Sequence, residues 1–125
     1  MRGILFRGKM VYEMPKPFSE WIRGYLCFVY TDNPLKARIY NTSTAKSYDV
    51  LTETVGQFTG LYDNNGIKIF EGDIVFINGA EKGTIVWDSE KLEYRVNMED
   101  VQIKLGLLYS RDLKVIGTIH DKAGD

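Results

Sequence analysis

The stretch that decides the fold, QFTGLYDNNGIKIFEGDIV, runs from Gln57 to Val75. Its short runs of β-branched and aromatic residues are separated by turn-forming residues at 63–66 and again at 71–73. Asn and Gly adopt positive φ at little cost, and Asp accepts hydrogen bonds from backbone groups two residues further on. We therefore expect a hairpin that turns at 63–66, then a second sharp turn, then a strand.

The polar residues of this stretch also admit functional interpretations. Asp63 and its neighbours offer oxygen ligands for calcium, but an EF-hand loop needs alternating acids, a later glutamate and flanking helices. Glu71 and Asp73 could act as an acid–base pair, but such a pair needs one carboxyl with a raised pKa. We therefore expect a structural motif, with no catalytic, cofactor-binding or metal-binding role. Its residues are Thr59, Gly60, Asp63, Gly66, Glu71, Gly72 and Asp73.

The rest of the chain repeats this pattern of short runs bounded by glycines, which is typical of an all-β fold with little helix. Residues 74–77 are apolar on both faces, which predicts a central strand. Residues 92–98 alternate between apolar and polar, which predicts a half-buried strand. The strands are expected at residues 3–7, 10–13, 24–30, 36–40, 55–61, 67–70, 73–78, 83–88, 93–98 and 113–119.

Helix signals are weak throughout. Residues 19–23 could form one helical turn, and residues 44–54 have no clean helical period. Gly106 interrupts an alternating pattern, so residues 100–111 are expected to be irregular or strand. No helix longer than about three turns is expected.

The distribution of prolines indicates two regions. Pro15, Pro17 and Pro34 all lie in the first part of the chain, whereas the sequence after residue 54 is compact and rich in turns. We expect an N-terminal β lobe of residues 1–54 packed on a C-terminal part of residues 55–125, or one compact unit formed by both.

The charges narrow the range of partners. The chain has 16 Lys and Arg and 17 Asp and Glu, a net charge of −1, and its like charges cluster only in pairs. A dedicated nucleic-acid binder usually has a basic face, so nucleic acid is not indicated, although folding could still form a basic patch. No apolar run reaches the length of a signal peptide core or a membrane span. We expect a cytoplasmic protein with no membrane partner.

The residues that most often carry chemistry are sparse. Cys27 is the only cysteine and lies in an apolar run, so we expect it to be buried and inert. His120 is the only histidine, has no second His or Cys as a metal partner, and is expected at the periphery. No glycine-rich phosphate loop precedes a helix. We therefore expect that the protein is not an enzyme and binds no cofactor.

The aromatic residues could form a stacking platform for single-stranded nucleic acid if Lys and Arg lay between them on the same face. Around the central stretch acidic residues lie between them instead, so core packing is the expected role, with an exposed subset available to a protein partner. The aromatic residues concerned are Trp21, Tyr25, Phe58, Tyr62, Phe70, Phe76, Trp87, Tyr94 and Tyr109.

Several segments resemble the YopX family, which comprises small phage and prophage proteins found mostly in Gram-positive bacteria. The resemblance covers nearly the whole chain and is least clear at residues 41–49 and 98–112. The segments that carry it are RGILFRGK at 2–9, EWIRGY at 20–25, ETVGQFTGLYD at 53–63 continuing to FEGDIV at 70–75, GTIVWD at 83–88 and VIGTIH at 115–120.

The resemblance implies a β-rich protein whose C-terminal part is a small SH3-like barrel. The family has no established biochemical function, so no catalytic residue is implied. We expect a non-enzymatic protein-interaction module with an unknown protein partner, which could also form homo-oligomers. The alternative is a nucleic-acid-associated accessory protein of phage replication or regulation, with Lys36 and Arg38, or Lys104 and Arg111, as its basic residues.

Overall fold

The computed structural model describes residues 4–12, 18–32 and 34–121. The fold is all-β, as expected, and these described residues form two antiparallel sheets and two short 3₁₀ helices. Of the described residues, 4–57 form one compact unit and 58–121 form another, here called the N-terminal and C-terminal units. No helix in these described ranges is long and apolar enough to cross a membrane.

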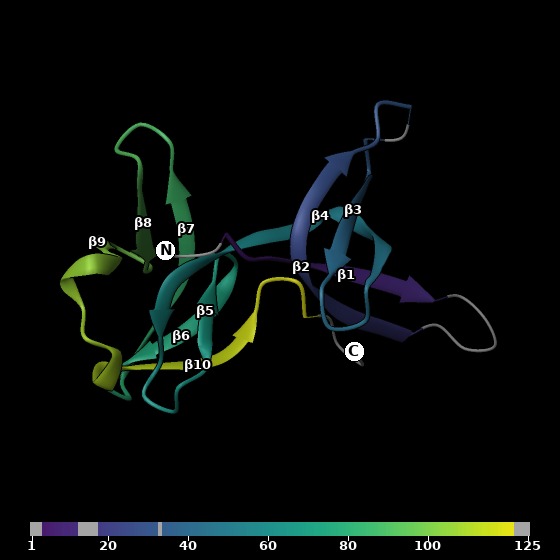
Figure 1. Ribbon diagram of the computed structural model, residues 1–125. Coiled ribbons are helices and arrows are strands. Elements are labelled where there is room, and N and C mark those ends of the chain that lie inside the picture. Colours follow the sequence, from purple (N-terminus) through teal and green to yellow (C-terminus); the bar gives the residue numbers. More distant parts are fainter. Residues whose placement is uncertain (1–3, 13–17, 33, 122–125) are drawn as a thin grey trace. The chain divides into compact units, whose positions relative to one another are not determined.

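Most of the described elements are β-strands (Figure 1). In chain order they are β1 (Phe6–Tyr12), β2 (Phe18–Val29), β3 (Lys36–Asn41), β4 (Lys46–Tyr62), β5 (Lys68–Phe70), β6 (Asp73–Ile77), β7 (Glu81–Asp88), β8 (Glu93–Asn97), β9 (Gln102–Lys104), η1 (Leu105–Leu107), η2 (Ser110–Asp112) and β10 (Leu113–Thr118).

The N-terminal unit is a ring of four strands, in which β1 pairs with β2, β2 with β3, β3 with β4, and β4 again with β1. Ring closure satisfies backbone groups that an open sheet would leave at its edges. Alternate side chains point into the ring, and its core consists of Ile22, Ala37, Ile39 and Val50. The side chains at the intervening positions therefore point outward, and they form the candidate surface described below.

The C-terminal unit contains a sheet with the strand order β10-β6-β7-β8-β9, together with the hairpin formed by β5 and the end of β4. The apolar run at 74–77 lies in β6, between β10 and β7, so the expected central strand is confirmed. The buried core consists of Ile69, Val75, Ile77, Ile85, Val96, Met98, Leu105 and Leu113.

Several boundaries differ from the expected ones. Residues 19–23 lie in β2, and residues 46–54 belong to β4, which at 17 residues contributes strand to both units. Leu92, expected on a buried face, is exposed with φ 54°, because the β7–β8 hairpin turns there. Gly3 and Glu13, the expected ends of two strands, lie outside the described residues. The SH3-like character of the C-terminal unit stays a prediction.

Candidate functional site

The carboxylate of Asp63 holds the first turn of the central stretch. Its Oδ1 accepts hydrogen bonds from the N–H groups of Asn65 at 2.8 Å and Ile67 at 2.9 Å, and its Oδ2 accepts one from Val115 at 3.0 Å. Burial by itself raises the pKa of the carboxyl, but these three N–H donors more than offset it, so the pKa of Asp63 lies below its ordinary value of 3.8.

The same turn covers the outer edge of β10. The Asn64 N–H donates to the Leu113 carbonyl at 2.8 Å, next to the bond between Val115 and Asp63. Backbone groups of β10 that would face outward are thereby paired. The expected hairpin at 63–66 is confirmed, with Gly66 at φ 77°.

Thr59 and Gly60 shape the strand that leads into this turn. The Thr59 hydroxyl donates to the Ile69 carbonyl at 2.8 Å and accepts from the Leu61 N–H at 3.2 Å. Gly60 has φ 90°, where the pairing of β4 with β5 shifts in register. Both residues therefore join β4 to β5.

The second turn depends on Gly72 and Asp73. Gly72 has φ 92°, and its N–H donates to the Ile85 carbonyl at 2.8 Å while its own carbonyl accepts from the Ile119 N–H at 2.9 Å. Asp73 is buried, and its Oδ2 accepts the Phe70 N–H at 2.8 Å. These contacts fix the backbone at the entrance to β6.

Glu71 and His120 lie beside this turn. Burial, and then the nearby charge of Glu71, raise the pKa of the Tyr94 phenol. The ring of His120 is half-buried, and a Cβ placed on Gly72 would lie 3.4 Å from its Nε2. The motif residues are thus held in contacts that shape turns, and their purely structural role stays a prediction.

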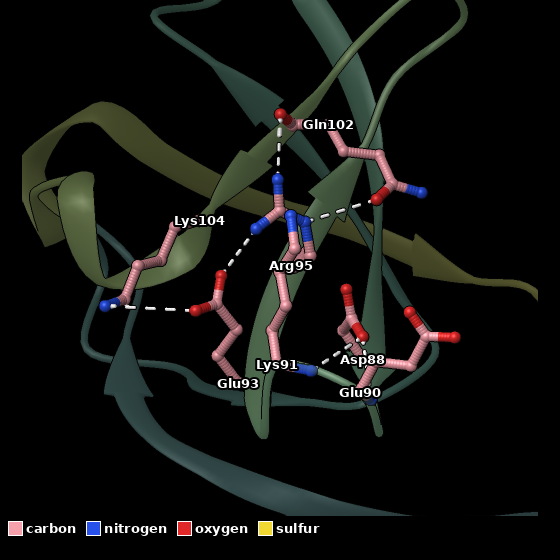
Figure 2. A network of polar contacts seen from close by, with 7 residues as sticks. All are labelled: Asp88, Glu90, Lys91, Glu93, Arg95, Gln102 and Lys104. Atoms are coloured by element: carbon pink, nitrogen blue, oxygen red, sulfur yellow. Dashed lines mark hydrogen bonds and ion pairs between the residues drawn. The ribbon is translucent and has the colours of Figure 1, made fainter.

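The outer face of β7, β8 and β9 carries a network of polar side chains (Figure 2). Arg95 forms an ion pair with Glu93, and its Nε donates to the Gln102 Oε1 at 3.2 Å. Lys104, expected as a nucleic-acid contact, places its Nζ 3.9 Å from Glu93 Oε1. Charges on this face therefore neutralise one another.

A loop formed by η1, η2 and the residues between them is anchored at both ends by buried leucines, Leu105 and Leu113. Between these anchors Leu107 is 71% exposed and Tyr109 is 64% exposed. The guanidinium of Arg111 lies 4.7 Å from the centroid of the Tyr109 ring, a cation–π distance. We call Leu107, Tyr109 and Arg111 the loop patch.

The outer face of the N-terminal ring carries a second group of residues, here called the aromatic face, in which four are exposed and Arg38 is half-buried: Tyr25, Phe28, Lys36, Arg38 and Tyr40. Tyr25 lies opposite Tyr40 across β2 and β3, and Phe28 lies opposite Arg38. Tyr25 is 53% exposed, Phe28 48% and Tyr40 37%. Exposed aromatic residues and cations therefore share one sheet face.

Arg38 is held in place by three neighbours. Its Nε donates to the Tyr30 hydroxyl at 3.2 Å, its NH1 donates to Ser47 Oγ at 2.8 Å, and its NH2 lies 3.0 Å from Asp49 Oδ1. Tyr30 in turn donates to Asp49 Oδ1 at 3.0 Å, and its ring meets Phe28 edge-on at 5.0 Å. The hydrogen bond to Tyr30 and then the charge of Asp49 raise the pKa of Arg38.

Cations continue along the same side of β1 and β2. The Arg7 guanidinium lies 4.4 Å from the Trp21 ring centroid and the Lys9 Nζ lies 5.7 Å from it, both side chains being buried. Arg23 lies directly opposite Arg7 in the strand register and is exposed. On the outward-facing side of β2, an aromatic residue, a cation and a second aromatic residue therefore follow one another: Trp21, Arg23 and Tyr25.

Of the nine aromatic residues expected to pack in the core with an exposed subset, four are exposed: Tyr25, Tyr62, Trp87 and Tyr109. Lys36 and Arg38 were expected as a possible basic contribution, but their place on one face with exposed aromatic residues was not. The signal for it is present in the sequence, because residues 36, 38 and 40 read Lys, Arg, Tyr at the period of two that puts side chains on one face. The pairing of Tyr40 with Tyr25 is long-range and leaves no such signal.

The expected burial of Cys27 is wrong, since its side chain is exposed. The register of β2 against β3 shifts between Leu26 and Phe28, and this irregularity turns Cys27 away from the core.

A hollow of about 450 Å³ in the C-terminal unit is lined by Glu81, Lys82, Met98, Glu99, Asp100 and Val101. Within the described part of the chain, no three His, Cys, Asp or Glu side chains gather as a metal site would require.

The family described as YopX protein matches residues 22–124 of the chain. This span includes the turn motif, the loop patch and most of β2 to β3, which carry the aromatic face. No curated protein matches the chain.

Proposed function

The chain belongs to the YopX family, and from that premise we propose that it is a non-enzymatic protein-interaction module of phage or prophage type that acts in the bacterial cytoplasm. The observation that carries the proposal is the loop patch of the C-terminal unit. Binding residues are often placed on loops that a rigid scaffold positions. Leu107, Tyr109 and Arg111 lie on such a loop, between the buried anchors Leu105 and Leu113.

The loop is held in shape by its own backbone. The Leu108 N–H donates to the Leu105 carbonyl at 3.0 Å, and the Asp112 N–H donates to the Tyr109 carbonyl at 3.0 Å. The Asn78 N–H then ties the end of the loop to β6 through the Asp112 carbonyl at 2.8 Å. A loop ordered before binding loses little conformational entropy when a partner docks.

The residue types of the loop patch favour a protein partner. Tyr and Arg are enriched among the residues that dominate protein–protein binding energy, and exposed apolar side chains add buried area. Arg111 Nε also lies 4.0 Å from Asp112 Oδ1.

The experiment compares the loop variant Leu107→Ser/Tyr109→Ser with Leu92→Ser as a matched control. Leu92 is 73% exposed, close to the value for Leu107, and lies on a different hairpin of the same unit. Tagged full-length chains capture partners from prophage-carrying cells, and each captured protein is then purified and titrated. We expect the loop variant to bind at least about tenfold more weakly, while wild type and Leu92→Ser bind equally.

Light scattering of the chain alone tests whether the partner is a second copy. A mass that rises with concentration in wild type and Leu92→Ser, and falls to that of the monomer in the loop variant, would identify the partner as the chain itself. Equal affinity of the loop variant and wild type for every purified partner would contradict the proposal.

A further inference from the structure

We propose that the aromatic face of the N-terminal unit binds single-stranded nucleic acid. This inference goes beyond the proposed function, which depends on the loop patch of the other unit. Proteins that bind single strands without base preference combine aromatic side chains, on which bases stack, with cations that contact the phosphates. The aromatic face places both on one side of β2 and β3, with Tyr25 opposite Tyr40 and Phe28 opposite Arg38.

The aromatic rings are available for stacking. Tyr25, Phe28 and Tyr40 are 53%, 48% and 37% exposed, which leaves much of each side chain in contact with solvent. Tyr25 and Tyr40 are directly opposite each other across β2 and β3, where Cβ atoms lie about 5 Å apart, and Phe28 follows Tyr25 on β2 beyond the register shift. The three rings therefore gather on one face of the sheet, where unpaired bases can stack.

The face is ordered before any ligand arrives. The ring of Phe28 rests edge-on against Tyr30 at 5.0 Å, and the Tyr30 hydroxyl is bonded to both Arg38 and Asp49. Arg38 has a further bond to Ser47, so one of its edges is fixed against the sheet. Side chains that are already positioned lose less freedom on binding, which strengthens the complex.

The charge of the N-terminal unit is complementary to a polyanion. Residues 1–57 contain eight Lys and Arg against five Asp and Glu, a net charge of +3, whereas residues 58–121 contain seven against eleven, a net charge of −4. Lys36 is exposed two residues before Arg38 on β3, and Arg23 is exposed two residues before Tyr25 on β2. Asp49 is the carboxylate that pairs with Arg38.

Two other occupants are less well matched to the face. A duplex hides the faces of its bases, so it cannot use the exposed rings for stacking. An acidic protein segment would meet the cations, but lysine is depleted from protein interfaces, and Lys36 lies on the face itself. An unpaired strand uses both the rings and the charges.

The test is fluorescence anisotropy of the full chain with a labelled oligothymidine of about 16 nucleotides, the upper end of site sizes for single small barrels. Wild type is expected to bind, and Tyr25→Ala and Phe28→Ala are each expected to weaken binding about tenfold. Trp87→Ala is the matched control, because Trp87 is an exposed aromatic in the acidic unit and should leave affinity unchanged.

Salt dependence tests the phosphate contacts separately. The logarithm of affinity should fall linearly with the logarithm of salt concentration, and Lys36→Gln should reduce that slope by about 0.7, the value for one phosphate on a single strand. An unlabelled duplex of the same sequence and length is expected to compete poorly with the labelled strand. Circular dichroism of each variant confirms that its fold is retained.

The outcomes separate the occupants. If the oligothymidine binds but Tyr25→Ala and Phe28→Ala bind as tightly as wild type, the face is not the site and the proposal is wrong. If the oligothymidine fails to bind at low salt while the same variants abolish self-association, the face is a protein interface, which also overturns it. Neither result bears on the loop patch, whose variants are different.

Discussion

In the C-terminal unit the carboxylates of Asp63 and Asp73 are buried and bound to backbone N–H groups, whereas in the N-terminal unit Tyr25, Phe28 and Arg38 lie at the surface. Asp63 and Asp73 belong to the most distinctive stretch of the sequence, and what they do is hold turns. The aromatic face comes from plainer sequence, and its aromatic side chains are exposed, so a ligand can reach them. In this protein the recognisable sequence motif therefore forms turns of the fold, whereas the candidate binding surface is formed by strands whose sequence has no distinctive motif.

The two tryptophans allow each unit to be followed separately, because Trp21 lies in the N-terminal unit and Trp87 in the C-terminal unit. Fluorescence of Trp87→Phe reports unfolding of the N-terminal unit, and fluorescence of Trp21→Phe reports the C-terminal unit.

The largest expected effect is that of Gly24→Ala in the N-terminal unit. A Cβ at this position would lie 1.9 Å from the carbonyl oxygen of Tyr40, and a backbone atom in a paired strand cannot move aside cheaply. We expect a loss of about 3 kcal/mol or more in the free energy of unfolding of this unit. Urea titration in the Trp87→Phe background measures it; a midpoint equal to that of Trp87→Phe alone would contradict the β2–β3 pairing.

The next largest effect is expected for Gly72→Val in the C-terminal unit, compared with His120→Ala. Gly72 has φ 92°, which a β-branched residue adopts only with strain, and its new side chain would press toward the half-buried ring of His120. We expect a loss of about 3 kcal/mol for Gly72→Val and clearly less for His120→Ala. Thermal melting in the Trp21→Phe background compares them, and equal melting temperatures would reject the account of this turn.

Asp63→Asn should cost about 2 kcal/mol, because a charged acceptor of three backbone N–H groups is lost. The pKa of Asp63 is lowered in the folded protein, so the unfolded state binds the proton more readily. The stabilisation is therefore complete above pH 3.8, the ordinary value, and is lost as the pH falls through the lower folded-state pKa.

Urea midpoints between pH 6 and pH 2 test this prediction. The wild type should lose stability in the acid range more steeply than Asp63→Asn, so the two curves approach each other. Parallel curves would mean that Asp63 does not contribute to the acid dependence.

The smallest effect is expected for Arg38→Gln. Its ion pair with Asp49 is partly exposed on both sides, and such pairs contribute about 0.2–1 kcal/mol. The two variants compare the two units directly: Arg38 positions side chains of the aromatic face, whereas Asp63 holds a turn of the fold, so Asp63→Asn should lower the free energy of unfolding more than Arg38→Gln. A loss of stability as large as that of Asp63→Asn, in the same urea titration, would contradict it.

The sequence allowed the local features of the fold to be predicted. The turn at 63–66 and the central strand at 74–77 depend on neighbouring residues, and both are confirmed. Residues 46–54 were missed as strand, although residues 46–51 pair with β3 in a hairpin whose turn includes Ala45 at φ 57°. The burial of Arg7 and Lys9 beside Trp21 is set by tertiary packing, which no local pattern reports.

The candidate surface was only partly predictable. Lys36 and Arg38 were named from the sequence as a possible basic contribution, and the structure places them beside Tyr40 on the outer face of β3. Tyr25 joins them only through the register of β2 against β3, which includes an irregularity near Cys27. The opposite net charges of the two units become visible once the chain is divided at residue 57.

The most direct test of the central claim is an NMR titration of the full chain with oligothymidine. The claim is that the aromatic face of the N-terminal unit, and not the turn motif or the outer face of β7–β9, contacts the ligand. The account predicts that the ring signals of Tyr25, Phe28 and Tyr40 shift progressively, while those of Trp87 and Tyr94 stay in place. Shifts confined to the C-terminal unit, or none at low salt, would contradict it.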